Sequence, residues 1–147
     1  MSNENRNVII LVKGTQNNGS GEPNLLELVT EGKYYKKEDS FYVVYKETEI
    51  TGMSGTTTTV SISPRKVTLT RSGSVNSQLI FEQGHKHVSY YDTVSGAFTI
   101  GVLTNFMDIK VDEHGGELMV DYSLEIDSSR TGDNDFYMSI REVKENE

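Results

Sequence analysis

The sequence contains no cysteine. This absence excludes a disulfide framework, a thiolate nucleophile and a cysteine-based zinc site. No apolar run approaches the roughly 20 residues that a membrane-spanning helix needs. The first residues, MSNENRN, lack the basic segment followed by a long apolar run that marks a secretory signal. We therefore expect a soluble cytoplasmic protein with no membrane partner.

Positive charge is scarce, because 14 lysines and arginines face 22 aspartates and glutamates. The formal net charge is −8 and the sequence pI is about 4.9. Nucleic-acid backbones and anionic membranes reward positive charge, so neither is an expected partner. A chain of this length buries roughly 68–70% of its unfolded surface, which provides a core without covalent cross-links. We expect one domain over residues 1–147, with residues 1–6 and 143–147 frayed.

Motifs that mark common catalytic sites are also missing from the sequence. There is no G-x-S-x-G elbow and no glycine-rich phosphate loop that opens a helix. Glu47 and Glu49 resemble the carboxylate pair of glycosidases, but two acids at this spacing are ordinary on a strand. We therefore predict that the protein is not an enzyme, has no catalytic residues and requires no cofactor.

Short segments of alternating apolar and polar residues, separated by glycine-rich turns, fill most of the chain. The clearest pattern spans 117–127, where one face is apolar and the other is charged, as in an antiparallel strand with one wet side. We predict strands at 7–15, 25–35, 41–49, 56–62, 67–71, 75–82, 85–93, 97–109, 117–127 and 135–143, with 128–134 as a turn. In 97–109 the alternation places Phe98, Ile100, Val102, Thr104 and Phe106 on one face.

About ten such strands in succession indicate an antiparallel meander. Closure into a barrel removes exposed sheet edges, so we predict an all-β, antiparallel up-and-down barrel of about 8–10 strands. A β-sandwich is the alternative. A barrel of about eight strands has an interior that fits side chains or one small ligand.

Arg71 extends an apolar row on the last of three predicted strands within 41–71. Successive residues alternate between faces, so Arg71 shares the inward face of Val67 and Leu69. Two strand spacings, roughly 9.6 Å, separate it from Glu47 and Glu49. A buried guanidinium without a partner is costly, so we expect a pair with one of these acids. A register slip would instead turn Glu47 to solvent and leave Arg71 extending outward at the strand end.

Several residues occur in an order and spacing typical of one family. They are Tyr42, Tyr45, Glu47, Gly52, Thr58, Arg71, Gly73, Phe81, Tyr90, Gly96, Thr104, Gly116, Leu118 and Tyr122. Through these residues the chain resembles, from about Val8 to Ile140, the YwiB-like family of bacterial proteins of unknown function. The resemblance implies a lipocalin-like (calycin) barrel in a cytoplasmic protein, and it implies no activity.

Two functional hypotheses follow from the predicted barrel. The first is a protein that binds a small anionic or amphipathic ligand around the Arg–Glu pair. Its predicted ligand-binding residues are Arg71, Glu47, Tyr45, Thr58, Tyr90 and Tyr122. The second is a protein–protein interaction module or homo-oligomer with a filled barrel, because 8–12 and 25–29 are apolar on both faces.

The three histidines allow a metal site to be considered. His85 and His87 share a strand face, and His114 lies in an acidic loop that could supply a third ligand. Histidines beside turns are more often solvent-exposed residues without a metal. We therefore predict no metal site.

Overall fold

The computed structural model describes residues 5–17, 24–51, 53–93 and 96–143, and the regular structure in these ranges is entirely β-strand. The strands are β1 (Arg6–Asn17), β2 (Asn24–Lys37), β3 (Ser40–Lys46), β4 (Thr56–Ile62), β5 (Val67–Gly73), β6 (Asn76–Phe81), β7 (Lys86–Thr93), β8 (Gly96–Asp112), β9 (Gly115–Ile126) and β10 (Ser129–Glu142). Each strand pairs with the next, and β1 pairs with β10 to close the barrel. The predicted antiparallel up-and-down barrel is confirmed, and the sandwich alternative is wrong.

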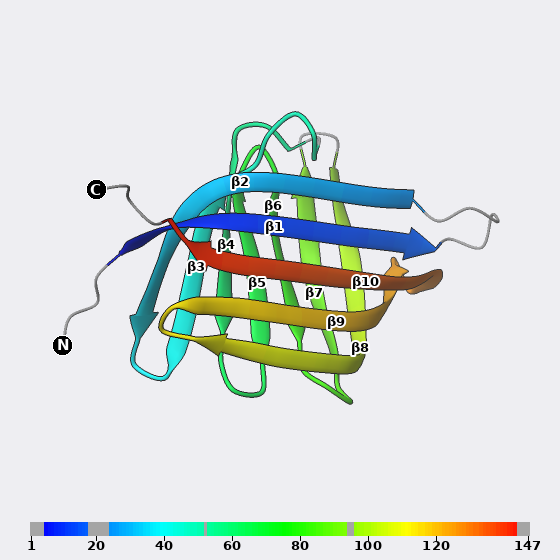
Figure 1. Ribbon diagram of the computed structural model, residues 1–147. Helices are drawn as coiled ribbons and strands as arrows, with labels where there is room; N and C mark the ends of the chain where they lie inside the picture. The colour runs from blue at the N-terminus through cyan, green and yellow to red at the C-terminus, as the bar shows by residue number, and fades with distance from the viewer. Residues whose placement is uncertain (1–4, 18–23, 52, 94–95, 144–147) are drawn as a thin grey trace.

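The barrel is flattened into two layers whose strands cross at a steep angle (Figure 1). In the view of Figure 1, β1, β9 and β10 run across the front of β3 to β7. The long strands β2 and β8 connect the layers: β8 pairs with β7 over its first half and with β9 from Ile100 to Asp112. Crossed layers separate at their corners, where space is left for a pocket.

Glycine permits the bend of β2 that forms one such corner. A Cβ on Gly32 would lie 2.5 Å from the Val44 carbonyl oxygen and 3.2 Å from the Tyr45 Cβ, so only glycine fits where β2 crosses β3. Pairing with β3 is confined to Lys33–Lys37 of β2. From Asn24 to Gly32 the strand pairs with β1 instead. The change of pairing partner therefore places the bend of β2 at Gly32.

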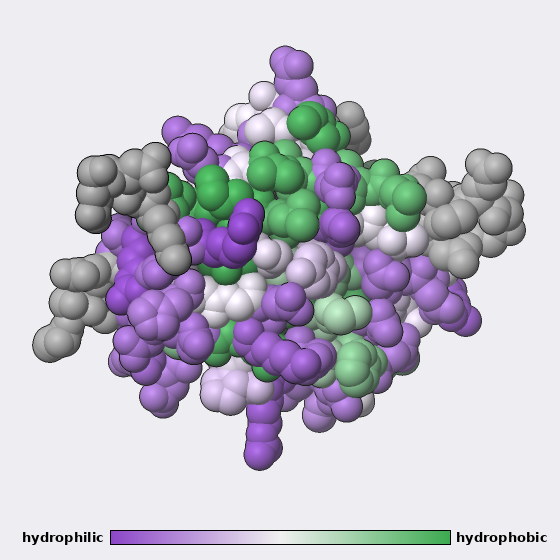
Figure 2. Space-filling view, in the orientation of Figure 1, coloured by the Kyte–Doolittle hydropathy of each residue, from purple (hydrophilic) through white to green (hydrophobic). Residues whose placement is uncertain are grey.

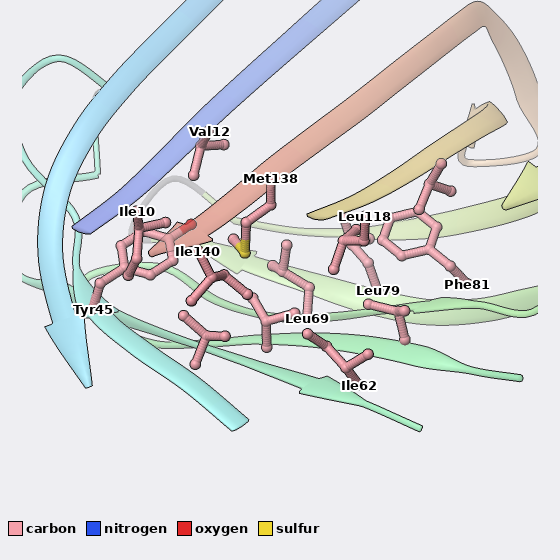
Figure 3. Close-up of a cluster of buried hydrophobic side chains, with 14 of the residues drawn as sticks. Ile10, Val12, Tyr45, Ile62, Leu69, Leu79, Phe81, Leu118, Met138 and Ile140 are labelled. Atoms are coloured by element: carbon pink, nitrogen blue, oxygen red, sulfur yellow. The ribbon is translucent and has the colours of Figure 1, made fainter. Parts of the chain in front are cut away.

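Inward-facing side chains from both layers form the core. Figure 3 shows Ile10, Met138 and Ile140 of the front layer pointing toward Ile62 and Leu69 of the back layer. All five are at most 2% exposed. Burying such side chains away from water is the main stabilising contribution to the fold.

A β-bulge overturns one predicted face. Thr104 pairs with Tyr122 and Phe106 pairs with Asp121, so Asn105 is an extra residue in β8. The alternation therefore changes phase, and Phe106 is 47% exposed rather than inward. Phe98, at the start of the strand, is also 40% exposed.

Some predicted boundaries require correction. Arg6 belongs to β1, and the Val143 amide donates to the Asn7 carbonyl over 3.0 Å, so these two residues are not frayed. The rest of the predicted frayed ends, and Gly52, fall mainly outside the described residues. Strand β10 already begins at Ser129, within the predicted turn, and carries an irregularity between Arg130 and Gly132. In the described ranges, no helix is both long and apolar enough to cross a membrane.

Candidate functional site

Three neighbouring strands place Tyr45, Thr58 and Arg71 side by side on the inner face of the barrel. Tyr45 is opposite Thr58, and Thr58 is opposite Arg71. Tyr45 is 4% exposed and Thr58 is fully buried. The Arg71 side chain retains 17% of its surface. The predicted inward direction of Arg71 is therefore confirmed.

Glu47 is the acid that pairs with Arg71. Its backbone amide donates to the Thr56 carbonyl over 2.8 Å, which extends the β3–β4 pairing one residue beyond the end of β3. Its side chain consequently stays inward, is 1% exposed, and has Oε2 3.8 Å from Arg71 Nε. The Thr58 hydroxyl donates to the same carboxylate. Glu49 is exposed, so Glu47 is the one of the two candidate acids that pairs with Arg71.

These polar groups border a pocket of about 410 Å³ at the corner between β2 and the segment that joins β3 to β4. A volume of this size falls within the range of roughly 300–1,000 Å³ that is usual for small-molecule sites. Six lining residues contribute polar groups: Tyr45, Glu47, Thr51, Arg71, Tyr122 and Asp135. Most of the remaining lining is apolar or small: Val12, Gly14, Leu25, Leu26, Leu28, Met53 and Phe136.

Arg71 is incompletely satisfied. Its Nε is buried and has no hydrogen-bond partner among the described residues, because 3.8 Å to Glu47 exceeds hydrogen-bonding distance. A guanidinium carries five N–H donors and no acceptor. Buried donors without partners are rare in folded proteins, and they often belong to functional sites. The part of Arg71 that borders the pocket therefore offers positive charge and donors to a ligand.

Tyr45 and Tyr122 add neutral donors to this corner. Burial raises the pKa of both phenols, and the negative charge of Glu47 raises the pKa of Tyr45 further. Both hydroxyls therefore keep their protons at neutral pH. The Tyr122 ring lies against Phe81 of the back layer, with ring centroids 4.9 Å apart, which holds its orientation.

The family model described as a domain of unknown function, DUF1934, matches residues 10–138. The chain belongs to this family. It is 26% identical to the uncharacterized beta-barrel protein YwiB of Bacillus subtilis (strain 168) over 106 residues. The aligned region spans 72% of this chain and 73% of YwiB. The crystal structure of the ywiB protein from Bacillus subtilis superposes with a TM-score of 0.84 at 21% identity, covering 95% of this chain and 94% of that one.

These matches confirm the YwiB-like resemblance and the β-barrel fold of this DUF1934 member. The family is one of unknown function, as the resemblance implied. The lipocalin-like relationship stays a prediction. The site must therefore be interpreted from its own geometry.

Tyr90 does not belong to the pocket. Strand β7 turns Tyr90 outward, where it is 74% exposed beside Val88, while Tyr91 packs against the core. Both faces of this segment carry a tyrosine, so the sequence alternation did not distinguish them. Tyr90 therefore lies outside the pocket, and the other five predicted residues gather at one corner of the barrel.

The histidines do not gather in this structure. His87 Nε2 lies 3.0 Å from Glu82 Oε1. His114 Nδ1 lies 3.4 Å from Glu142 Oε1, beside Arg6. Among the described residues, no group of three or more histidines and acids is arranged to hold a metal ion.

The apolar half of the pocket was not predicted. Gly14, Leu26, Leu28 and Phe136 come from β1, β2 and β10 and meet the polar row only because the barrel closes. The alternation of apolar residues in β2 indicates that Leu26 and Leu28 share one face. It does not indicate which distant strand this face contacts.

Buried tyrosines make the stability of the protein sensitive to alkaline pH. Burial raises the pKa of Tyr34, Tyr45 and Tyr122. The unfolded chain releases these protons near the ordinary tyrosine pKa of about 10. Their stabilising contribution is thus fully present below that pH and is lost as the pH rises toward the folded-state values. We expect urea midpoints to hold up to about pH 9 and to fall increasingly steeply from about pH 10 upward.

Two variants separate this effect from general alkaline damage. Tyr122→Phe removes one of the three phenols, so its urea midpoint should fall less steeply with pH. Tyr90→Phe removes a phenol that is 74% exposed and should leave the slope unchanged. Equal slopes in all three proteins would contradict the assignment.

Proposed function

We propose that this pocket binds a small amphipathic ligand whose acidic group contacts Arg71 and whose apolar part lies against the leucines of β2. The observation that carries the proposal is the partly buried Arg71 side chain, which lines a largely apolar pocket and whose ion-pair partner among the described residues, Glu47, is 3.8 Å away. A hydrogen bond to a charged group contributes about 1.5–3 kcal/mol. The proposal is one of binding without catalysis, in a cytoplasmic protein.

Glu47 does not prevent an acidic ligand from binding. It faces Arg71 from the Nε side and is already hydrogen-bonded by Thr58. A guanidinium carries five N–H donors, so Arg71 has donors beyond the one that faces Glu47, and a pair of them matches the geometry of a carboxylate. Tyr122 supplies a further neutral donor at the pocket wall.

Decanoate, a ten-carbon carboxylate, is a suitable probe by isothermal titration calorimetry. It should bind at least about tenfold more tightly than decanol, because only the acid engages Arg71. Arg71→Gln keeps a polar side chain but removes the charge, and it should abolish this preference. Equal affinities for decanoate and decanol in the unmodified protein would contradict the proposal.

Gly14→Leu should block the pocket without touching the polar row. Gly14 lines the pocket, and a Cβ there would meet its nearest neighbour, the Asp135 carbonyl oxygen, at an ordinary 3.9 Å. Its backbone does not have the left-handed conformation that favours glycine. We expect decanoate affinity to fall at least about tenfold with the fold intact.

The matched control is Lys13→Leu, which adds the same side chain one residue earlier, on the outer face. The Lys13 side chain is 53% exposed, with Nζ 3.6 Å from Glu27. This variant should bind decanoate like the unmodified protein. Unchanged binding by Gly14→Leu would place the ligand elsewhere.

A homo-oligomer is the second candidate function. Leu25 and Val29 on the outer face of β2 are 77% and 64% exposed, and Leu11 of β1 pairs with Val29. Exposed apolar patches of this kind mark interaction surfaces. Val29→Lys should then lower the association measured by sedimentation velocity at micromolar concentrations. A monomer at every concentration in the unmodified protein would contradict this candidate.

A further inference from the structure

In the part of the chain that the structure describes, half of β2 pairs with another strand on one side only. Between Asn24 and Gly32 the strand pairs with β1 on one side, and its ladder to β3 begins only at Lys33. Figure 1 shows this half of β2 forming the upper border of the front layer. Proteins usually cover or charge such an edge, since its free N–H and C=O groups pair readily with another extended chain.

The free edge of β2 runs along the pocket. Leu26 and Leu28 of this edge line the pocket, and Thr51 and Met53 line it from the opposite side. Leu26 is 38% exposed, and Ile50, beside Thr51, is 65% exposed. Figure 2 shows hydrophobic surface gathered over β2 and toward the segment between β3 and β4. An extended chain on this edge would therefore have its alternate side chains over an apolar surface.

Arg71 lies at the polar end of the same pocket. Its charge is matched by Glu47, but its Nε has no hydrogen-bond partner among the described residues. Arg71, on β5, and Glu47 both line this pocket, which the edge of β2 borders. A chain terminus that carries a carboxylate fits this end, because it supplies acceptors for the guanidinium and does not need to continue.

We propose that this corner binds the C-terminal segment of an extended polypeptide. Its backbone pairs with the free edge of β2 between Leu25 and Glu31, apolar side chains at alternate positions enter the pocket, and its terminal carboxylate contacts Arg71. This is strand addition combined with capture of a chain terminus. The inference rests on the proposed function, since it uses the same pocket and the same arginine, and it names the class of ligand.

Charge restricts the peptides that fit. The protein carries a formal net charge of −8, and Glu27 and Glu31 are exposed on the outer face of β2. Acidic side chains on the outward positions of the peptide would lie next to these carboxylates. The preferred peptide is therefore apolar at inward positions, neutral or basic at outward positions, and negative only at its end.

The test uses the full-length protein and a pool of N-acetylated heptapeptides of degenerate sequence, prepared once with free C-terminal acids and once as amides. The acid pool should yield enriched sequences on the unmodified protein but not on Gly14→Leu. Each enriched peptide is then resynthesised as its amide and as two versions N-methylated at every second residue, one for each phase. The amide should bind at least about tenfold more weakly, because it lacks the charge that Arg71 engages.

The N-methylated peptides test the backbone pairing. The version that loses the N–H groups facing β2 should bind at least about tenfold more weakly than the version in the opposite phase. Amide hydrogen exchange followed by NMR should also slow at alternate residues from Leu25 to Glu31 when the acid peptide binds. Decanoate occupies the pocket without a backbone and should not slow these amides.

The outcomes distinguish failure of this inference from failure of the proposed function. If decanoate binds in an Arg71-dependent manner but no acid peptide is enriched, only the inference is overturned. It is equally overturned if the amide, or both N-methylated versions, bind as well as the parent peptide. If the free edge of β2 is protected in a dimer that peptides do not dissociate, its occupant is a second copy. If neither decanoate nor any peptide binds, both proposals fail.

Discussion

Replacing Arg71 by alanine is expected to lower the free energy of unfolding by about 3–5 kcal/mol. The substitution leaves Glu47, whose side chain is 1% exposed, without its cation. The Thr58 hydroxyl still donates to the carboxylate, but a neutral donor does not replace the lost positive charge. Urea denaturation followed by circular dichroism measures the change.

A double-mutant cycle with Glu47→Gln isolates the pair from the loss of packing. When Glu47 is already replaced by glutamine, Arg71→Ala leaves no buried carboxylate without a cation. The two substitutions together should therefore destabilise the protein by less than the sum of their separate effects. Arg65→Ala, at an exposed position in the β4–β5 turn, is the control and should change stability by within about 0.5 kcal/mol. Strict additivity of Glu47→Gln and Arg71→Ala would show that the two charges are not coupled.

The row from Tyr45 to Arg71 was predictable because its information is local. Residues 47–55 join β3 to β4 and residues 63–66 join β4 to β5, so consecutive strands are neighbours and the alternation of each strand fixes which residues meet. Glu47 was less certain, because β3 ends at Lys46 and one backbone hydrogen bond decides its direction. The sequence alone therefore placed Arg71 inward but left the choice between Glu47 and Glu49 open.

The pocket itself depends on information that no single segment contains. Its apolar wall comes from β1, β2 and β10, which reach the polar row by barrel closure and by the bend at Gly32. A glycine within a strand signals that a bend is allowed, but it does not specify the direction of the bend. The free edge of β2 is a consequence of that bend, and it was not predictable from alternation.

The bulge in β8 shows the same limit on a smaller scale. An extra residue shifts every later side chain to the other face, and Asn105 has no feature that distinguishes it from a paired residue. The apolar residues on both sides of it, from Phe98 to Ile109, permit either phase. Two phenylalanines allow the consequence to be measured, because Phe81 is buried and Phe106 is exposed.

Phe81→Ala is expected to lower the free energy of unfolding by about 3–5 kcal/mol, the usual cost of removing a fully buried aromatic ring. Phe81 is 1% exposed and lies between Tyr122 and Phe136, with ring centroids 4.9 and 6.4 Å away. Phe106→Ala removes the same atoms at a position that is 47% exposed, so it should cost less than about 1 kcal/mol. Urea denaturation of both variants compares them directly.

Phe81 also connects the core to the pocket, so its loss should be visible in ligand binding. Its ring supports Tyr122 and Phe136, which both line the pocket. Phe81→Leu retains an apolar side chain and most of the stability, but it removes the flat surface that holds the Tyr122 ring. We expect it to weaken decanoate binding while Phe106→Leu does not. If the two leucine variants bind decanoate equally well, the orientation of Tyr122 does not depend on the core beneath it.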